Sequence, residues 1–204
     1  MLALIDYGAG NLTSVKKALA AVGADVVVPS TPEQLASAHG VIVPGVGHFG
    51  ATRALAGAWK DAIVRRIGEG RPVLGICLGM QWLFEGSDEA PDVPGLGILG
   101  GRCYRLGTVR PEPDQRVKVP HVGWNSLTID GGASIVDGVA DGAQVYFTHS
   151  YVAPLTSDTV AVTEHGETFA SIVQHGRIAG VQFHPEKSGD VGLRVLQNFL
   201  QLAG

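Results

Sequence analysis

Two patterns of apolar residues divide the chain. Up to residue 84, short aliphatic runs alternate with stretches in which apolar residues recur every three or four positions. The runs predict strands, and the recurring positions predict helices. Strands are expected at residues 2–5, 25–28, 41–43 and 73–74, and helices at 12–22, 32–38 and 51–67. This alternation is typical of parallel strands joined by crossover helices.

The second pattern lies between Gly97 and Gly180, where helical spacing is rare and short strand-like runs follow one another. Strands are expected at residues 115–119, 126–129, 144–147, 160–164, 169–174 and 178–183. The pair His175-Gly176 predicts a tight hairpin turn between the last two, so antiparallel strands extend the sheet. A final helix follows, with Ser188 as its N-cap.

The two patterns together predict an α/β fold. We expect an open mixed, mainly parallel central sheet flanked by helices, with antiparallel strands in the C-terminal half. The 204 residues are enough for one domain with a sizeable core. Since no repeat, linker or low-complexity segment is found, we expect residues 1–204 to form a single domain.

Composition and charge narrow the class of protein. The net charge of −4 and the pI near 5.9 argue against a nucleic-acid partner, because no cluster of Lys and Arg contradicts them. The two cysteines make no disulfide framework and indicate a reducing compartment. No apolar stretch approaches the length of a membrane span, and Asp6 comes too early for a signal peptide. A soluble, cytoplasmic protein is expected.

A cysteine lies where the strand at 73–74 meets the start of a predicted helix. Cys77 is flanked by Gly75 and Gly79, which match the G-x-nucleophile-x-G elbow. The glycines permit a sharp turn that exposes the central side chain, and the helix dipole favours a thiolate there. The alternative is a buried structural cysteine beside two packing glycines.

A histidine and a carboxylate far down the chain favour the first interpretation. The apolar-rich run that starts at Val181 ends in His184-Pro185-Glu186, where the proline fixes the local φ. A nucleophilic cysteine needs a base, and the base needs an orienting group. We therefore expect Cys77, His184 and Glu186 to form a catalytic set. The alternatives are a solvent-exposed histidine and a helix N-terminal charge.

Two glycine-rich loops follow predicted strands. Residues 44–50 lie at the carboxyl end of a strand, where open α/β sheets place their sites, and backbone N–H groups of such a loop can hold an oxyanion. A simple strand-to-helix turn would have the same composition. Residues 8–10, Gly-Ala-Gly, suggest a dinucleotide site, but Thr13 occupies the third glycine's place and no ribose-binding acid follows. No nucleotide cofactor is expected.

These elements together resemble the glutamine amidotransferases of the cysteine-triad type, and the resemblance covers the whole chain. The elbow, the 44–47 loop and His184-Pro185-Glu186 stand in the family's order and spacing. Three further strings are similar to the glutaminase subunits of imidazole glycerol phosphate synthase. They are Asp6-Tyr7-Gly8-Ala9-Gly10-Asn11-Leu12, Pro120-His121-Val122-Gly123-Trp124-Asn125 and Pro185-Glu186-Lys187-Ser188.

The resemblance assigns roles to further residues. The oxyanion would be held by the N–H of Leu78 and by an N–H of the Val46-Gly47 turn. The expected substrate-binding residues are Gly45, Gln81, Thr148, Ser150 and Tyr151, with Gln81 one helical turn past the nucleophile. The surface that faces a partner is expected to carry His121, Trp124 and Lys187.

The resemblance also implies an activity and a partner. The activity is hydrolysis of L-glutamine to glutamate and ammonia through a Cys77 thioester, without metal or organic cofactor. The partner is a separate (β/α)8-barrel cyclase chain, bound as a heterodimer, which uses the ammonia to make imidazole glycerol phosphate and the aminoimidazole carboxamide ribotide in histidine biosynthesis. Since free hydrolysis would waste glutamine, we expect the lone chain to be nearly inactive until the cyclase reorients the 45–47 backbone.

Three alternatives remain open at this point. The chain could be a glutaminase that donates ammonia to another pathway, such as that of pyridoxal phosphate or anthranilate. It could be a cysteine hydrolase or peptidase on a related fold. It could also be a non-enzymatic binding module in which Cys77 is only a buried packing residue. Labelling of Cys77 by a glutamine-analogue electrophile would exclude this last hypothesis.

Overall fold

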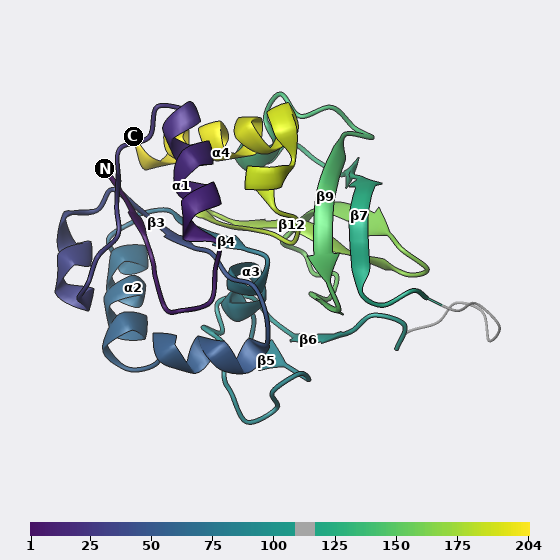
Figure 1. Ribbon diagram of the computed structural model, residues 1–204, viewed down its shortest axis with the longest axis horizontal. Coiled ribbons are helices and arrows are strands. Elements are labelled where there is room, and N and C mark those ends of the chain that lie inside the picture. Colours follow the sequence, from purple (N-terminus) through teal and green to yellow (C-terminus); the bar gives the residue numbers. More distant parts are fainter. Residues whose placement is uncertain (109–116) are drawn as a thin grey trace.

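A central sheet of eight strands runs through the molecule (Figure 1), in a computed structural model that describes residues 1–108 and 117–204. The strand order is β2–β1–β3–β4–β13–β12–β11–β8. In that order the strands are Val26–Val27, Leu2–Leu4, Gly40–Val43, Val73–Ile76, Ile178–Val181, Thr168–His175, Thr159–Glu164 and Thr128–Ile129. The first five pair in parallel and the last three antiparallel. The predicted fold class is confirmed.

Helices cover both faces of this sheet. In Figure 1, α1 (Leu12–Ala21) and α4 (Gly189–Ala203) lie above it, and α2 (Ala58–Gly68) and α3 (Leu78–Leu83) lie below it. Leu2 and Leu4 of β1 belong to the core under α1 and α4. Ala3, between them, belongs to the core over α2 and α3. Because successive strand side chains point to opposite faces, a strand buried on both faces is a continuous apolar run.

Two small sheets stand apart from the central one. Strand β7 (His121–Ser126) pairs antiparallel with β9 (Gln144–His149), and the pair crosses the direction of β12 at the right of Figure 1. Strands β10 (Tyr151–Val152), β6 (Arg102–Arg105) and β5 (Gly86–Ser87) form a three-stranded sheet. The prediction that the antiparallel strands all extend the central sheet is therefore right for β8, β11 and β12 and wrong for β9.

Two of the predicted strands are not found as single strands. The run at 126–129 is divided between the end of β7 and β8. In the run at 115–119, residues 115 and 116 lie outside the described residues, and 117–119 form no strand. The predicted hairpin at His175-Gly176 is confirmed, because β12 and β13 pair antiparallel across a Gly176 with φ +57°.

Three helices differ from the sequence prediction. Residues 51–67 are not one helix: a 3₁₀ helix covers Phe49–Leu55, and α2 starts after Gly57, whose φ of +65° no helix accommodates. Residues Pro32–Ser37 form a 3₁₀ helix. Ser188 stands at the N-cap of α4 without a capping bond, because its hydroxyl donates to the His184 carbonyl and accepts from the Tyr146 N–H.

Within residues 1–108 and 117–204, no helix has both the length and the apolar content needed to cross a lipid bilayer. The same part of the chain contains no group of three or more His, Cys, Asp or Glu side chains that could hold a metal ion.

Candidate active site

A sharp turn between β4 and α3 carries Cys77. Its φ is 53°, and no other described residue except glycine has a positive φ. A Cβ on Gly79 would lie 1.8 Å from the Val43 carbonyl oxygen, and a Cβ on Gly75 would lie 2.5 Å from the Gly79 carbonyl oxygen. Both positions therefore exclude a side chain, and the cysteine is held at the bend by the close approach of its neighbours.

The neighbouring strand β13 brings His184 to the cysteine. Val181 is in register with Ile76, and its carbonyl accepts from the Cys77 N–H at 2.7 Å. Three residues later, the His184 N–H donates to the Tyr146 carbonyl of β9. Because parallel strands of one sheet end on the same side, residues that are far apart in sequence meet here.

Glu186 orients the imidazole. Its Oε1 lies 2.8 Å from His184 Nδ1, and each side chain is only 2% exposed. Since a carboxylate only accepts, Nδ1 carries the proton and Nε2 is the nitrogen left for Cys77. Among the described residues, that Nε2 has no hydrogen-bond partner, so the imidazole is held at one end only.

The charge state of His184 follows from its two neighbours. Burial lowers its pKa, but the interactions with Cys77 and Glu186 outweigh burial and raise the pKa to about 9. A buried imidazolium is stable only when opposite charge or acceptors surround it. At neutral pH His184 therefore carries a proton that it can give to a leaving group.

The loop that follows β3 lies against the elbow, and two backbone N–H groups in this region already have acceptors. The N–H of Leu78 donates to the Gly45 carbonyl at 3.3 Å, and the N–H of Val46 donates to the Ala9 carbonyl at 3.2 Å. Gly47 has a φ of +97°. In this conformation, two of the three N–H groups expected at an oxyanion point at carbonyl oxygens of the chain itself.

Tyr7 packs underneath this loop. Its hydroxyl is buried and has no hydrogen-bond partner in the part of the chain that the structure describes. A Cβ on Gly45 would lie 2.1 Å from that hydroxyl, so only glycine fits there. Burial, and next the negative charge of a Cys77 thiolate, raise the pKa of Tyr7, which stays protonated.

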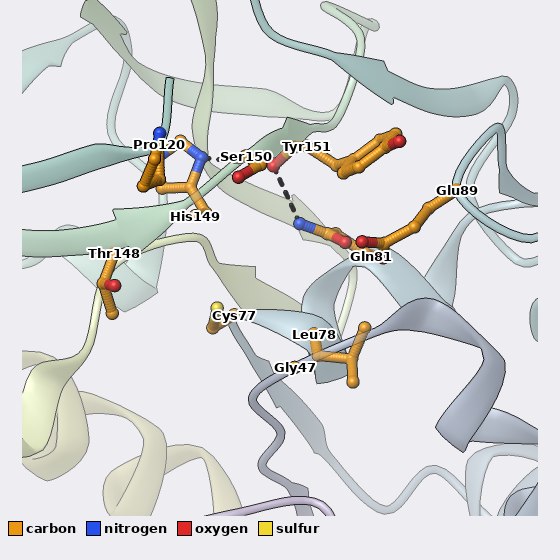
Figure 2. Close-up of a pocket in the computed structure, with 10 residues that line it drawn as sticks. All are labelled: Gly47, Cys77, Leu78, Gln81, Glu89, Pro120, Thr148, His149, Ser150 and Tyr151. Carbon is orange, nitrogen blue, oxygen red and sulfur yellow. Dashed lines mark hydrogen bonds between the residues drawn. The ribbon is translucent and has the colours of Figure 1, made fainter. Parts of the chain in front are cut away.

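A cavity of about 290 Å³ opens in front of Cys77 (Figure 2). Its lining consists of Gly47, Cys77, Leu78, Gln81, Glu89, Pro120, Thr148, His149, Ser150 and Tyr151. The structure thus brings all but one of the expected substrate-binding residues to the same cavity. The exception is Gly45, which belongs to the 44–50 loop but does not line the cavity.

The Gln81 side chain lines the cavity and is also hydrogen-bonded to the rest of the protein. Its Nε2 donates to the Tyr151 carbonyl at 2.9 Å, as Figure 2 shows, and to Gln182 Oε1 at 3.1 Å. An amide nitrogen has two hydrogens, so only Oε1 is left to bind a ligand.

Glu89 is a cavity residue that sequence reasoning missed. Its Oε2 accepts from the Phe49 N–H at 2.7 Å, which points the carboxylate inward from a loop that resembles ordinary surface. Acidic residues are expected in such a loop, so no local signal distinguishes Glu89. It is the only carboxylate among the residues that line this cavity.

His121 does not lie on the exposed surface where the sequence predicts it. Its side chain is buried, 3% exposed, whereas Val122 and Trp124 are each 56% exposed. Because side chains alternate along β7, His121 points inward and cannot present its ring to a partner, while Trp124 can. Lys187 lies over the Tyr146 ring, 5.6 Å from its centre, next to Trp124, which contacts the same ring.

The sequence is similar to a known protein family over almost its whole length. The family model of class-I glutamine amidotransferases matches residues 3–202. A relative from Natronomonas pharaonis, the imidazole glycerol phosphate synthase subunit HisH, is 43% identical over 97% of this chain and 92% of its own length. The subunit of the same name from Thermococcus kodakarensis is 42% identical over 99% of this chain and 100% of its own length.

Solved structures share the fold. The crystal structure of a glutamine amidotransferase has a TM-score of 0.75 at 23% identity, covering 99% of this chain and 98% of that one. The structure of PurLQS from Thermotoga maritima has a TM-score of 0.75 at 17% identity, covering 98% and 97%.

Proposed function

This chain belongs to the class-I glutamine amidotransferases and, among them, to the HisH glutaminase subunits of imidazole glycerol phosphate synthase in histidine biosynthesis. We propose that Cys77, His184 and Glu186 carry out the hydrolysis of glutamine. The observation that supports this most directly is the buried His184–Glu186 pair, with Cys77 among the causes of the raised His184 pKa. We also propose that residues 1–204 act as a single amidotransferase domain.

The reaction proceeds in two halves. The Cys77 thiolate attacks the side-chain amide carbon of glutamine, and His184 gives its Nε2 proton to the departing ammonia, which leaves a thioester. The neutral His184 then takes a proton from water, which attacks the thioester and releases glutamate and the thiolate. Glu186 holds the imidazole and stabilises its cation throughout. Neither half requires a metal or an organic cofactor.

The oxyanion of each tetrahedral intermediate binds to backbone N–H groups of Leu78 and of the Val46-Gly47 turn. The bond from the Leu78 N–H to the Gly45 carbonyl has to open first. We propose that the cyclase partner drives this rearrangement, so that the lone chain is nearly inactive. Full glutaminase turnover by the purified chain without any partner would count against it.

The substrate's α-groups bind at the far end of the cavity. Glu89 is suited to the α-ammonium because it supplies negative charge there, and Gln81 Oε1 adds an acceptor. The segment Thr148 to Tyr151 binds the α-carboxylate, largely through its backbone.

The partner is a separate cyclase chain with a (β/α)8 barrel, bound as a heterodimer in the cytoplasm. The exposed Val122 and Trp124 of β7, with Lys187 nearby, form the surface that it covers. Apolar side chains exposed on one face of a strand are typical of a protein interface.

One experiment tests this function. In the complex reconstituted with the cyclase, Cys77→Ala should abolish synthesis from glutamine and spare synthesis from an added ammonium salt. Cys103→Ala is the matched control, because Cys103 is buried with its sulfur facing the Gln81 carbonyl and should support both reactions. Loss of both reactions in Cys77→Ala would indicate a structural role and contradict the proposal.

A further inference from the structure

A second buried glutamine lies against the sulfur of Cys77. Gln182 follows β13 directly and has no exposed surface. Its Nε2 donates to Cys77 Sγ at 3.6 Å, and its backbone N–H donates to the Ser171 carbonyl at 2.9 Å. Both ends of the residue are therefore fixed, the backbone by the neighbouring strand and the side chain by the nucleophile.

A backbone carbonyl determines which end of this amide faces the sulfur. The Tyr151 carbonyl can only accept, so Gln81 has to present its NH₂ group there. The same NH₂ group reaches Gln182 at 3.1 Å, which requires Gln182 to present its oxygen. Gln182 Nε2 is then left for the sulfur, and a reversed amide would place oxygen against oxygen or nitrogen against nitrogen.

A second donor holds the Tyr151 carbonyl in place. His149 Nδ1 lies 3.1 Å from it, as Figure 2 also shows, so that nitrogen carries the proton and His149 Nε2 accepts from His121 Nδ1 at 3.1 Å. His121 Nε2 then accepts from the Asn125 amide at 3.3 Å.

Both histidines are neutral at physiological pH, so in each ring Nδ1 remains a donor and Nε2 remains an acceptor. Burial, and then the nearby His165, lower the pKa of His121 to about 4. Burial and, next, the neighbouring His121 lower the pKa of His149 to about 3. The hydrogen bond to the Tyr151 carbonyl raises this pKa by a smaller amount, and His165 and His184 lower it slightly further. A continuous series of hydrogen bonds therefore leads from Asn125 on β7 to the sulfur.

We propose that Gln182 is a positioning residue for the nucleophile, and that its amide, oriented through Gln81 and the Tyr151 carbonyl, donates to the Cys77 thiolate and aims it at the substrate. A thiolate only accepts hydrogen bonds, so a neutral donor with a fixed direction favours the thiolate without competing for its proton. This inference rests on the proposed role of Cys77 as the nucleophile.

The test replaces the amide with a side chain of similar length. Gln182→Met removes the donor and should slow alkylation of Cys77 by iodoacetamide at pH 7 by about tenfold or more, since a hydrogen bond to a charged group is lost. In the complex with the cyclase, its glutaminase kcat should fall roughly 10- to 100-fold while KM stays within about twofold. Gln174→Met is the matched control, because it removes three side-chain hydrogen bonds, one more than Gln182→Met removes, and Gln174 does not line the cavity.

Two further variants separate positioning from packing. Gln182→Glu keeps the acceptor for Gln81 but puts a carboxylate oxygen against the sulfur, so it should be slower than Gln182→Met although it preserves more contacts. Gln81→Met leaves Gln182 in place but removes what orients it, so Cys77 alkylation without glutamine should slow as well. This second variant keeps the test informative if the Gln182 variants do not fold.

Alkylation at the wild-type rate in Gln182→Met or in Gln81→Met would overturn the inference, and so would a Gln182→Glu variant faster than Gln182→Met. In those cases, an inactive Cys77→Ala would leave the proposed function standing. A Cys77→Ala variant that still hydrolyses glutamine would instead overturn the proposed function itself.

Discussion

At the scale of the residue, two identical side chains differ in charge because their surroundings differ. His184 and His149 are both buried, and burial lowers the pKa of each. His184 has Glu186 and Cys77 beside it, and their effect exceeds that of burial. His149 has mainly histidine neighbours and a single carbonyl acceptor. The partner of the ring nitrogen, rather than the depth of burial, decides which histidine is a cation.

The raised His184 pKa predicts a pH profile. Glutaminase kcat/KM in the complex should decline as pH rises through about 9, because His184 then loses the proton needed by the leaving ammonia. Glu186→Gln retains a hydrogen-bond acceptor without the charge, so the decline should begin at lower pH. A pH–rate series of the two proteins measures this, and an unchanged alkaline limb in Glu186→Gln would argue against the assigned role.

The lowered pKa values of His121 and His149 predict how stability depends on pH. Between about pH 6.5 and pH 4 these two histidines bind protons in the unfolded chain but not in the folded one. The free energy of unfolding should therefore fall as pH falls through that window. Between pH 7 and pH 5 each of the two histidines should lower the free energy of unfolding by roughly 2 kcal/mol. Urea unfolding at both pH values measures it, and His149→Gln should show a smaller difference. An equal difference in the variant would mean that other groups cause it.

At the scale of the element, the carboxyl ends of three adjacent strands build the site. β3 leads into the 44–50 loop, β4 into the elbow and β13 into His184. At the elbow, β3 and α3 approach so closely that a Cβ on Gly79 would collide with the Val43 carbonyl. The elbow can form because residue 79 is a glycine. Backbone geometry, more than side-chain chemistry, places the sulfur.

Gly79 therefore tolerates no side chain. In Gly79→Ala the new methyl group would collide with the Val43 carbonyl, and we expect a loss of roughly 3 kcal/mol or more in the free energy of unfolding. Gly68→Ala in α2 is the control, since nothing lies within 4 Å of a Cβ there and the change should be neutral or slightly stabilising. Urea midpoints compare the two, and equal midpoints would contradict the steric argument.

At the scale of the whole molecule, the small β7–β9 sheet connects an exposed surface to the cavity. One face of β7 exposes Val122 and Trp124, while His121 on the other face begins the contacts that reach the Tyr151 carbonyl. The sheet thus has an exposed side and a buried side that leads to the cavity, and residues on the two sides are adjacent in the sequence.

Trp124→Ala should weaken binding of the cyclase by about 30-fold, the effect of removing an aromatic anchor worth roughly 2 kcal/mol. Val64→Ala is the control, because Val64 is also exposed but lies on α2, at the opposite end of the molecule in Figure 1. Calorimetric titration with the purified cyclase measures both. Equal affinities for the two variants would place the interface on another face.

Features whose physical cause is local can be derived from the amino-acid sequence alone. The run of apolar residues before Gly75 and the glycines around Cys77 specify the elbow, since a strand, a bend and a helix start each depend on a few adjacent residues. The alternation of strands and helices likewise determined the class of sheet. The helix break at Gly57 escaped prediction, because the apolar spacing continues through it.

Features that depend on contacts between distant segments become visible in the folded chain. Pairing of β9 with β7, the inward carboxylate of Glu89 and the direction of the Gln182 amide each require a partner from another part of the chain. The occupied N–H of Leu78 is of the same kind, since Gly45 belongs to another loop. A hydrogen bond has a direction and needs both of its groups in place, so no pattern within one segment could reveal these features.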